Sequence, residues 1–177
     1  MQESEVSLSA ALYYITSGLA KEDVRVSLDG AHIKTGDTIH FDIHGYLTSH
    51  NCHKVSGAVD SWQDMYEVEE YQQRIIISST LGIGDANIVT ADGKHLYVES
   101  KKGKEKNRSN SEYPLMREAI GQLMTGCRLD DNVVPVVAVP YSEKSYELAC
   151  RWSQLKQIRL VGIKFMLVHN SDEVEMI

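Results

Sequence analysis

The sequence predicts an α/β protein in which helices flank a mixed β-sheet. Segments with apolar residues at helical spacing alternate with segments of period two, and from residue 61 onward they follow the order α-β-β-β-α-β-α-β. The chain has 177 residues, of which 42% are hydrophobic and 24% charged. This composition supplies enough apolar surface for one compact domain of ordinary size.

The first 60 residues are expected to form an N-terminal helix and a small β-meander. Residues 7–20 carry apolar side chains at helical spacing, and Gly18 marks the end of this helix. Over residues 24–46 the apolar period changes to two, which predicts short antiparallel strands. The predicted organisation is therefore an elaboration over residues 1–60 and a core over residues 61–177, within one compact unit.

The core is predicted from its start and stop signals. Pro114 suits the first turn of a helix and Gly126 suits a helix end, while Asp92-Gly93 is a signal for a tight hairpin turn. Residues 133–139 are apolar throughout, as in a strand that is buried on both faces. The predicted helices cover residues 61–74, 114–125 and 142–155, and the predicted strands cover residues 74–79, 85–90, 95–101, 133–139 and 160–168.

The predicted hairpin over residues 85–101 carries the strongest chemical signal. Residues two apart share a face of a strand, so Asp85 and Asn87 point together, as do Glu99 and Lys101 on the next strand. The hairpin brings these pairs close to each other. Carboxylate oxygens are ligands for Mg²⁺, and a neighbouring lysine can hold a water molecule. The pattern is therefore typical of metal-assisted chemistry on phosphate.

This stretch resembles the active-site hairpin of the PD-(D/E)XK nuclease superfamily. Glu99-Ser100-Lys101 is similar to the acid-x-lysine motif of the family, and residues 117–123 are similar to the helix that often follows it. The resemblance covers about residues 61–168 and implies a restriction-endonuclease-like core of order α-β-β-β-α-β. It also implies a Mg²⁺-dependent endodeoxyribonuclease, with Mn²⁺ as a substitute metal, that hydrolyses phosphodiester bonds of duplex or branched DNA in restriction or repair. By the same analogy we expect a homodimer.

The resemblance also implies roles for individual residues. Lys101 would orient the attacking water, and Gln122, with Glu118 one turn earlier as a weaker candidate, would contact water or phosphate. Glu69, on the predicted helix over residues 61–74, would supply a further acid, with Glu70 as the second choice. The implied catalytic residues are Asp85, Asn87, Glu99, Lys101, Gln122 and Glu69, and the implied metal ligands are Asp85, Glu99 and the Ser100 backbone carbonyl.

Asn87 stands where many members of this family carry an aspartate. An amide oxygen brings no charge, so metal affinity should fall. Three interpretations remain open: Asp85 on the same face is the ligand, the chain is a naturally weakened or inactive nuclease, or the asparagine is an introduced replacement. The second interpretation leads to the alternative function, a non-catalytic nucleic-acid-binding or assembly subunit with a nuclease-like fold.

The charge distribution favours local contacts with nucleic acid. The net charge is −7, so the chain as a whole should not attract a polyanion. A basic loop follows the hairpin, and its side chains are expected to contact DNA phosphates in a salt-dependent way, although a solvated charge run is the alternative. No sequence feature separates DNA from RNA. The implied phosphate-binding residues are Lys102, Lys104, Lys106 and Arg108.

Five of the seven histidines lie within residues 32–53. His40, Asp42 and His44 would share one face of a strand, so a zinc site is geometrically conceivable. Zinc motifs with knuckle spacing are absent from the sequence. A substrate-facing or dimer-forming elaboration is therefore the favoured interpretation of this segment.

The remaining features of the sequence predict a cytoplasmic protein with no membrane partner. No apolar run approaches the ~20 residues of a membrane span. The N-terminus is acidic, unlike a secretory signal. The three cysteines are widely separated, which is typical of reduced thiols.

Overall fold

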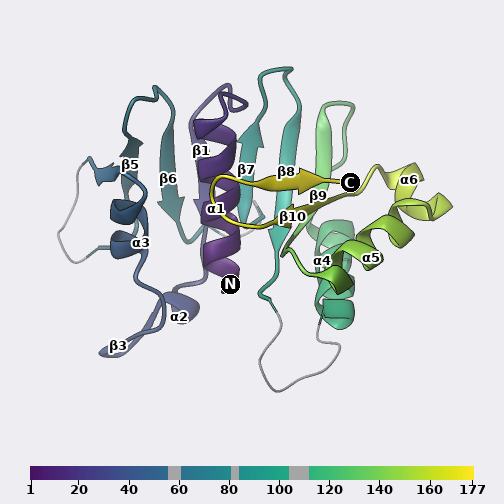
Figure 1. The fold of residues 1–177 in the computed structure, drawn as a ribbon, viewed down its shortest axis with the longest axis horizontal. Helices are drawn as coiled ribbons and strands as arrows, with labels where there is room; N and C mark the ends of the chain where they lie inside the picture. Colours follow the sequence, from purple (N-terminus) through teal and green to yellow (C-terminus); the bar gives the residue numbers. More distant parts are fainter. Residues whose placement is uncertain (56–60, 81–83, 104–111) are drawn as a thin grey trace.

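The computed structural model describes residues 1–55, 61–80, 84–103 and 112–177. Its described strands form one nine-stranded mixed sheet and a separate two-stranded hairpin, with helices on both faces of the large sheet (Figure 1). The predicted α/β class with a mixed sheet is therefore confirmed. Among these residues, no helix combines the length and the apolar character that a bilayer crossing demands.

The order of strands in the large sheet is β11-β10-β9-β8-β7-β1-β6-β5-β4. These strands are β1 (Val24–Ser27), β4 (Cys52–Lys54), β5 (Met65–Val68), β6 (Arg74–Ser78), β7 (Ala86–Val89), β8 (His95–Ser100), β9 (Val133–Pro140), β10 (Lys164–Val168) and β11 (Val174–Met176). The small hairpin consists of β2 (Lys34–Thr35) and β3 (Thr38–Ile39). The helices are α1 (Glu3–Thr16), α2 (Gly30–Ile33), α3 (Ile43–Ser49), α4 (Glu112–Gly126), α5 (Glu143–Ser153) and α6 (Lys156–Val161).

The centre of the sheet is built from β1, β7, β8 and β9. β7 is antiparallel to both of its neighbours, β1 and β8, whereas β8 and β9 are parallel. β1 also pairs in parallel with β6 on its other side. β1 and β7 are neighbours in the sheet although β2 to β6 lie between them in the sequence. The elements between β1 and β7 therefore form a long insertion at the centre of the sheet.

Helix α1 packs across one face of the sheet and is buried almost all round. Its apolar residues join the larger core with residues from β1, β7 and β8. Two of its buried hydroxyls, those of Ser7 and Ser9, are hydrogen-bonded, as most buried polar groups are. Ser7 Oγ donates to Ser100 Oγ at 2.9 Å, and Ser9 Oγ lies 2.8 Å from Tyr46 Oη. These bonds fix α1 against the end of β8 and against α3.

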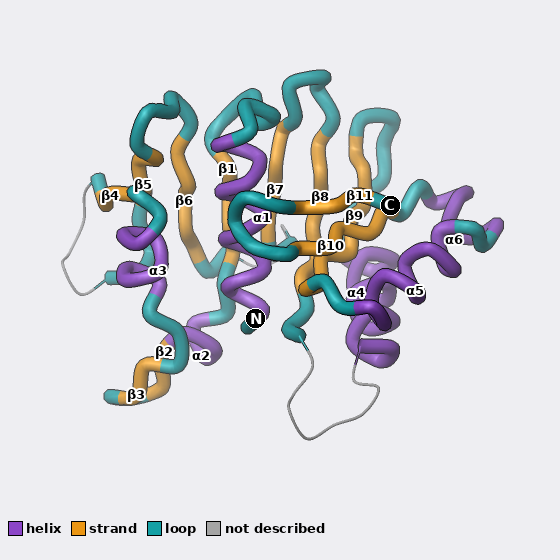
Figure 2. Tube along the Cα trace, in the orientation of Figure 1, coloured by secondary structure: helices purple, strands orange, loops and turns teal. Residues whose placement is uncertain are grey.

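Helices α4, α5 and α6 gather on the opposite face at one end of the sheet (Figure 2). Alternation along β9 and β10 explains the separation. Val136 and Met166 face the α1 core, whereas Val137 and Phe165, one residue away, face the second core with Trp152 of α5. Both strands are therefore buried on both faces, as the apolar run over residues 133–139 predicts.

The helix predicted over residues 61–74 is wrong, because this segment contains β5 and the start of β6. Tyr66 and Val68 are buried while Glu67 between them is exposed, and this alternation of burial is that of a strand. Pairing with β4 and β6, which lie on either side, selects the extended conformation over the local helical pattern.

The strand predicted over residues 160–168 is too long at its start. Leu160 belongs to α6 and is 77% exposed, so it is not a core residue. Gly162 ends α6 in the left-handed conformation with φ of 81°, and β10 begins only at Lys164.

The predicted meander over residues 24–46 also differs from the structure. Its first strand is β1, at the centre of the large sheet, and the sheet and first core therefore cross the boundary predicted at residue 60. His40, Asp42 and His44 do not share a strand. The Asp42 carboxylate instead accepts a hydrogen bond from Gly45 N at 2.9 Å and caps α3, which contains His44.

Candidate functional site

The two acidic positions of the predicted hairpin meet at the end where β7 begins and β8 ends. Ala86 is paired with Val98, so Asp85 lies directly opposite Glu99. Asp85 N donates to the Val98 carbonyl at 2.8 Å, and Ser100 N donates to Asp85 Oδ2 at 2.7 Å. The backbone of β8 therefore fixes the Asp85 carboxylate beside the end of the strand.

Gly84 allows this close approach of the two strands. Its φ is +72°, in the left-handed region that favours glycine. A Cβ atom on Gly84 would lie 2.9 Å from the Val98 carbonyl oxygen and 2.9 Å from Tyr97 Cε1. A side chain at this position would therefore displace the backbone that leads into Asp85.

We expect Gly84→Ala to lower the free energy of unfolding by about 2 kcal/mol or more, because it combines an unfavourable φ with a backbone clash. Gly93→Ala is the matched control, since Gly93 also has a positive φ of 83° but an added Cβ would meet no atom within 4 Å. That control should cost only about 1 kcal/mol. Urea denaturation measures both, and equal losses would show that the contact at Gly84 is unimportant.

The Asp85 and Glu99 carboxyls are held where ionisation is unfavourable. Burial is the main cause that raises the pKa of Asp85 to about 6, and the charge of Glu3 adds to it. Burial, followed by repulsion from Asp85, raises the pKa of Glu99 to about 7. Glu99 is only 8% exposed. Two partly buried carboxylates on neighbouring strands form a site that a bound cation would stabilise.

Lys101 supplies a buried positive charge next to this pair. The residue is 4% exposed, and its backbone N donates to the Ala138 carbonyl at 2.9 Å. Its Nζ lies 3.3 Å from Glu118 Oε1 on α4 and 3.7 Å from Glu3 Oε2 on α1. The ammonium group is thus held between helices from opposite faces of the sheet.

Glu3 is the acidic residue that sequence reasoning missed. It pairs with Lys101, and its charge raises the pKa of both Asp85 and Glu99. The only local signal is the placement of acidic residues in the first turn of α1, which also suits an ordinary helix N-terminus. Recognising Glu3 requires the knowledge that α1 and β1 belong to the centre of the fold.

Two cavities flank the site. One, of about 470 Å³, is lined by Asp85, Tyr97, Glu99 and Gln122, with hydroxyl groups from neighbouring loops. The other, of about 540 Å³, is lined by Lys101 and by residues from α1, α2, α4 and the segments near them. These residues include Glu3, His32, His40, Lys102, Leu115 and Glu118. Helix α2 contributes residues to both cavities. The carboxylate pair therefore lines one cavity and Lys101 lines the other.

The donor set fits a hard divalent cation. The Val98 carbonyl accepts a hydrogen bond from Asp85 N and therefore points from β8 toward β7. Ser100 lies two residues further along β8, so its carbonyl points toward the same side of the strand. Asp85, Glu99 and this carbonyl offer only oxygen atoms, which Mg²⁺ prefers. In the described part of the chain, no group of three or more His, Cys, Asp or Glu residues is placed to hold a metal. Water or substrate phosphate would have to complete the coordination, as is usual for Mg²⁺.

The other implied residues are placed as follows. Asn87 lies opposite Tyr97, two residues closer to the Asp92-Gly93 turn than Asp85. Gln122 lines the same cavity as Asp85 and Glu99. Glu69 and Glu70 do not join them, because they follow β5 and line a different cavity on the α1 face. The structure therefore brings Asp85, Glu99, Lys101 and Gln122 together and leaves Glu69 apart.

The basic loop is only partly covered by the structure. Lys102 is exposed and lines the cavity next to Lys101. Lys104, Lys106 and Arg108 lie outside the described residues, so their contact with DNA phosphates stays a prediction. His32 and His40 line the cavity that holds Lys101, which places part of the histidine-rich segment beside the site.

Comparison of the chain with protein-family models, with curated proteins and with solved structures found no match. Function is therefore inferred from the residues of the site and their arrangement.

Proposed function

We propose that the chain is a metal-dependent nuclease of the PD-(D/E)XK type that hydrolyses DNA phosphodiester bonds. The observation that carries this proposal is the cross-strand pair of Asp85 and Glu99 with the buried Lys101 two residues beyond Glu99. The charge of Lys101 is paired with Glu118 and Glu3, whereas burial raises the pKa values of Asp85 and Glu99 above their ordinary range. Such sites are frequently functional.

The order of elements supports a restriction-endonuclease-like core. Helix α1 is followed by β1, β7, β8, α4 and β9 at the centre of the fold, in the order α-β-β-β-α-β. In this assignment the first strand is β1 rather than the segment over residues 74–79, and residues 28–84 are an insertion. The acid of the first helix is then Glu3 in place of Glu69.

In the proposed reaction a water molecule loses a proton and attacks the phosphorus atom, one P–O ester bond breaks, and the departing oxygen takes up a proton. Asp85, Glu99 and the Ser100 carbonyl would hold Mg²⁺ or Mn²⁺. When bound, the metal would polarise a phosphoryl oxygen and lower the pKa of a bound water. Lys101 would orient that water, and its own position is maintained by Glu118 and Glu3. Gln122 would contact phosphate or water from the α4 side of the cavity.

The register favours one of the three interpretations of Asn87. Asp85 and not Asn87 lies opposite Glu99, so the proposed pair of carboxylates is complete without an aspartate at position 87. The competing function, a non-catalytic nucleic-acid-binding or assembly subunit, would follow if the neutral Asn87 left metal affinity too low for catalysis. Binding of Mg²⁺ distinguishes these two functions.

Cleavage of supercoiled plasmid DNA in Mg²⁺, in Mn²⁺ and in EDTA tests the proposal. The chain should cut only with metal, and Asp85→Asn should abolish cutting and Mg²⁺ binding. Asp131→Asn, which removes the same charge from an exposed position, should cut like the unchanged chain. Folded protein that neither binds Mg²⁺ nor cuts DNA or RNA would favour the non-catalytic function. Gel filtration at the same time would test the proposed homodimer.

A further inference from the structure

Three neighbouring strands end at the edge of the sheet that holds the proposed active site. β8, β9 and β10 are parallel, so their carboxyl ends lie side by side. Lys101 follows β8 directly, Tyr141 follows β9 and His169 follows β10. Neighbouring strands are ~4.8 Å apart, which places Tyr141 one strand and His169 two strands away from the strand that leads into Lys101. Open α/β sheets bind ligands at this edge.

The rings of Tyr141 and His169 stack on each other at this edge. Their centroids are 4.1 Å apart and their planes differ by 19°. The backbone of Tyr141 is fixed, because its N donates to the Val168 carbonyl at 2.9 Å. Tyr141 is nevertheless 42% exposed. It is therefore a large aromatic side chain that is held in one orientation at the surface.

A small cavity lies beside Tyr141 and next to the cavity that Lys101 lines. It has a volume of about 200 Å³ and is lined by Tyr141, Lys102, Leu115 and neighbouring residues. Lys102 and Leu115 also line the Lys101 cavity, so the two cavities share a wall. The charged side chains in the lining of the small cavity are those of Lys102 and Glu112. Its volume is below the ~300 Å³ of the smaller small-molecule sites, which suits a single flat ring.

We infer that Tyr141 stacks an unpaired base of the DNA next to the cleavage site, so that the substrate has a single-stranded segment. This inference rests on the proposed function, which makes DNA the ligand. Within a duplex each base is covered by its neighbours, and only an unpaired base offers its face to a protein ring. The Tyr141 ring, supported by His169, would contact that face, while Lys102 would contact a phosphate on the side of Lys101. Stacking needs no hydrogen bond to a base edge, so the site would accept any base.

Fluorescence anisotropy with labelled DNA tests the inference, in EDTA so that no metal-dependent cleavage occurs. A duplex with a single-stranded tail should bind about tenfold or more tightly than the same duplex with blunt ends, because stacking on an aromatic side chain contributes in this range. Tyr141→Ala should remove most of this preference, with circular dichroism used to verify the fold. Tyr141→Phe keeps the ring and should retain the preference. Equal binding of tailed and blunt DNA by the unchanged chain would overturn the inference.

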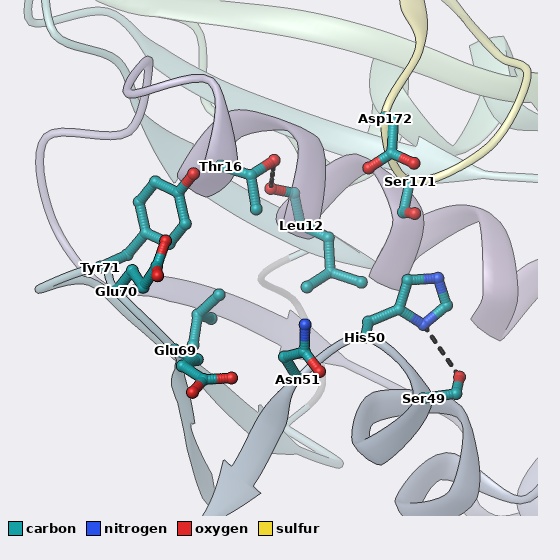
Figure 3. Close-up of a pocket in the computed structure, with 11 residues that line it drawn as sticks. Leu12, Thr16, Ser49, His50, Asn51, Glu69, Glu70, Tyr71, Ser171 and Asp172 are labelled. Carbon is teal, nitrogen blue, oxygen red and sulfur yellow. Dashed lines mark hydrogen bonds between the residues drawn. The ribbon is translucent and has the colours of Figure 1, made fainter.

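Tyr71→Ala is the matched control. Tyr71 is 39% exposed and lies in the turn before β6, at a pocket on the α1 face (Figure 3). Since β6 runs in the same direction as β8, its start lies at the opposite edge of the sheet from Lys101 and Tyr141. Tyr71→Ala should therefore leave the affinity for tailed DNA unchanged. An equal loss in Tyr71→Ala and Tyr141→Ala would contradict a specific role of the Tyr141 ring.

A tail of abasic sugars separates stacking from charge. It keeps the phosphates but has no base to stack, so most of the preference over blunt DNA should be lost. A preference that survives in the abasic tail would overturn the inference, because phosphate contacts alone would then hold the single strand. Cleavage in Mg²⁺, measured separately on the same DNA, distinguishes the two proposals. Binding that depends on Tyr141 without any cleavage would support stacking and contradict the nuclease, whereas cleavage with equal affinity for tailed and blunt DNA would contradict stacking alone.

Discussion

Replacing Lys101 by methionine is expected to lower metal-dependent DNA cleavage by about 10²- to 10³-fold, the range found when a single charge-stabilising group is removed from an active site. Lys101 is buried and lies between Glu118 and Glu3, next to the carboxylate pair. Methionine has a similar length and fills the same space, so the variant removes the charge and largely keeps the packing.

Lys102→Met is the matched control for this variant. It removes the same charge from the adjacent residue, whose side chain is exposed at the rim of the cavity. A lysine that only contacts phosphate contributes to affinity and to its salt dependence. Lys102→Met should therefore raise the protein concentration needed for half-maximal cleavage by a few-fold and leave the rate at saturating protein nearly unchanged.

Single-turnover cleavage at saturating protein separates the two effects, and circular dichroism verifies that both variants fold. Lys101→Arg provides a second test, because it keeps the charge but changes the shape of the donor group. It should recover part of the rate while Lys101→Met does not. A Lys101→Met variant that is folded and cuts at the original rate would show that this lysine serves only to pair with Glu118 and Glu3.

The parts of the site that were predicted from the sequence are those that local rules determine. The Asp92-Gly93 turn sets the register of the hairpin, and two-residue alternation then places Glu99 and Lys101 on one face. Gln122 follows from the helical period of α4. Each of these features depends on residues within about 30 positions of one another, and each could be inferred without knowledge of the rest of the chain.

The parts that were missed depend on contacts between distant residues. β1 is inserted between β6 and β7, and nothing near Val24–Ser27 specifies a partner some 50 residues away. The pattern over residues 61–74 fits a helix locally, but the neighbouring strands β4 and β6 impose the extended form. Under the proposed function, these two differences move the acid of the first helix from Glu69, as predicted, to Glu3 of α1, which packs on the centre of the sheet.

In the absence of metal, the chain is expected to lose stability as the pH rises from about 4 to about 8. The folded-state pKa values of Asp85 and Glu99, about 6 and about 7, lie above their ordinary values of 3.8 and 4.5. Between these limits the folded chain binds more protons than the unfolded chain, so a rise in pH favours unfolding. Above about pH 8 both carboxyls are ionised in both states and the full penalty is present.

Glu99→Gln should remove much of this penalty. At pH 8 in EDTA the variant should be more stable than the unchanged chain by about 2 kcal/mol, and at pH 4 the two should be nearly equal. Urea denaturation across this pH range measures the difference, with Glu22→Gln at an exposed position as the control of equal charge. If Glu99→Gln and Glu22→Gln have the same pH profile, Glu99 ionises in the folded chain without the cost that its burial implies.

Addition of Mg²⁺ then links this stability to the proposed function. A metal ion at the pair competes with protons and stabilises the ionised carboxylates, so the unchanged chain should gain stability from Mg²⁺ above pH 7 and gain little at pH 5. Glu99→Gln should gain little at either pH, because one ligand is lost. A gain that is the same in both proteins would place the metal elsewhere. Asp85 and Glu99 would then not bind the metal that the proposed reaction needs, and the non-catalytic function would be favoured.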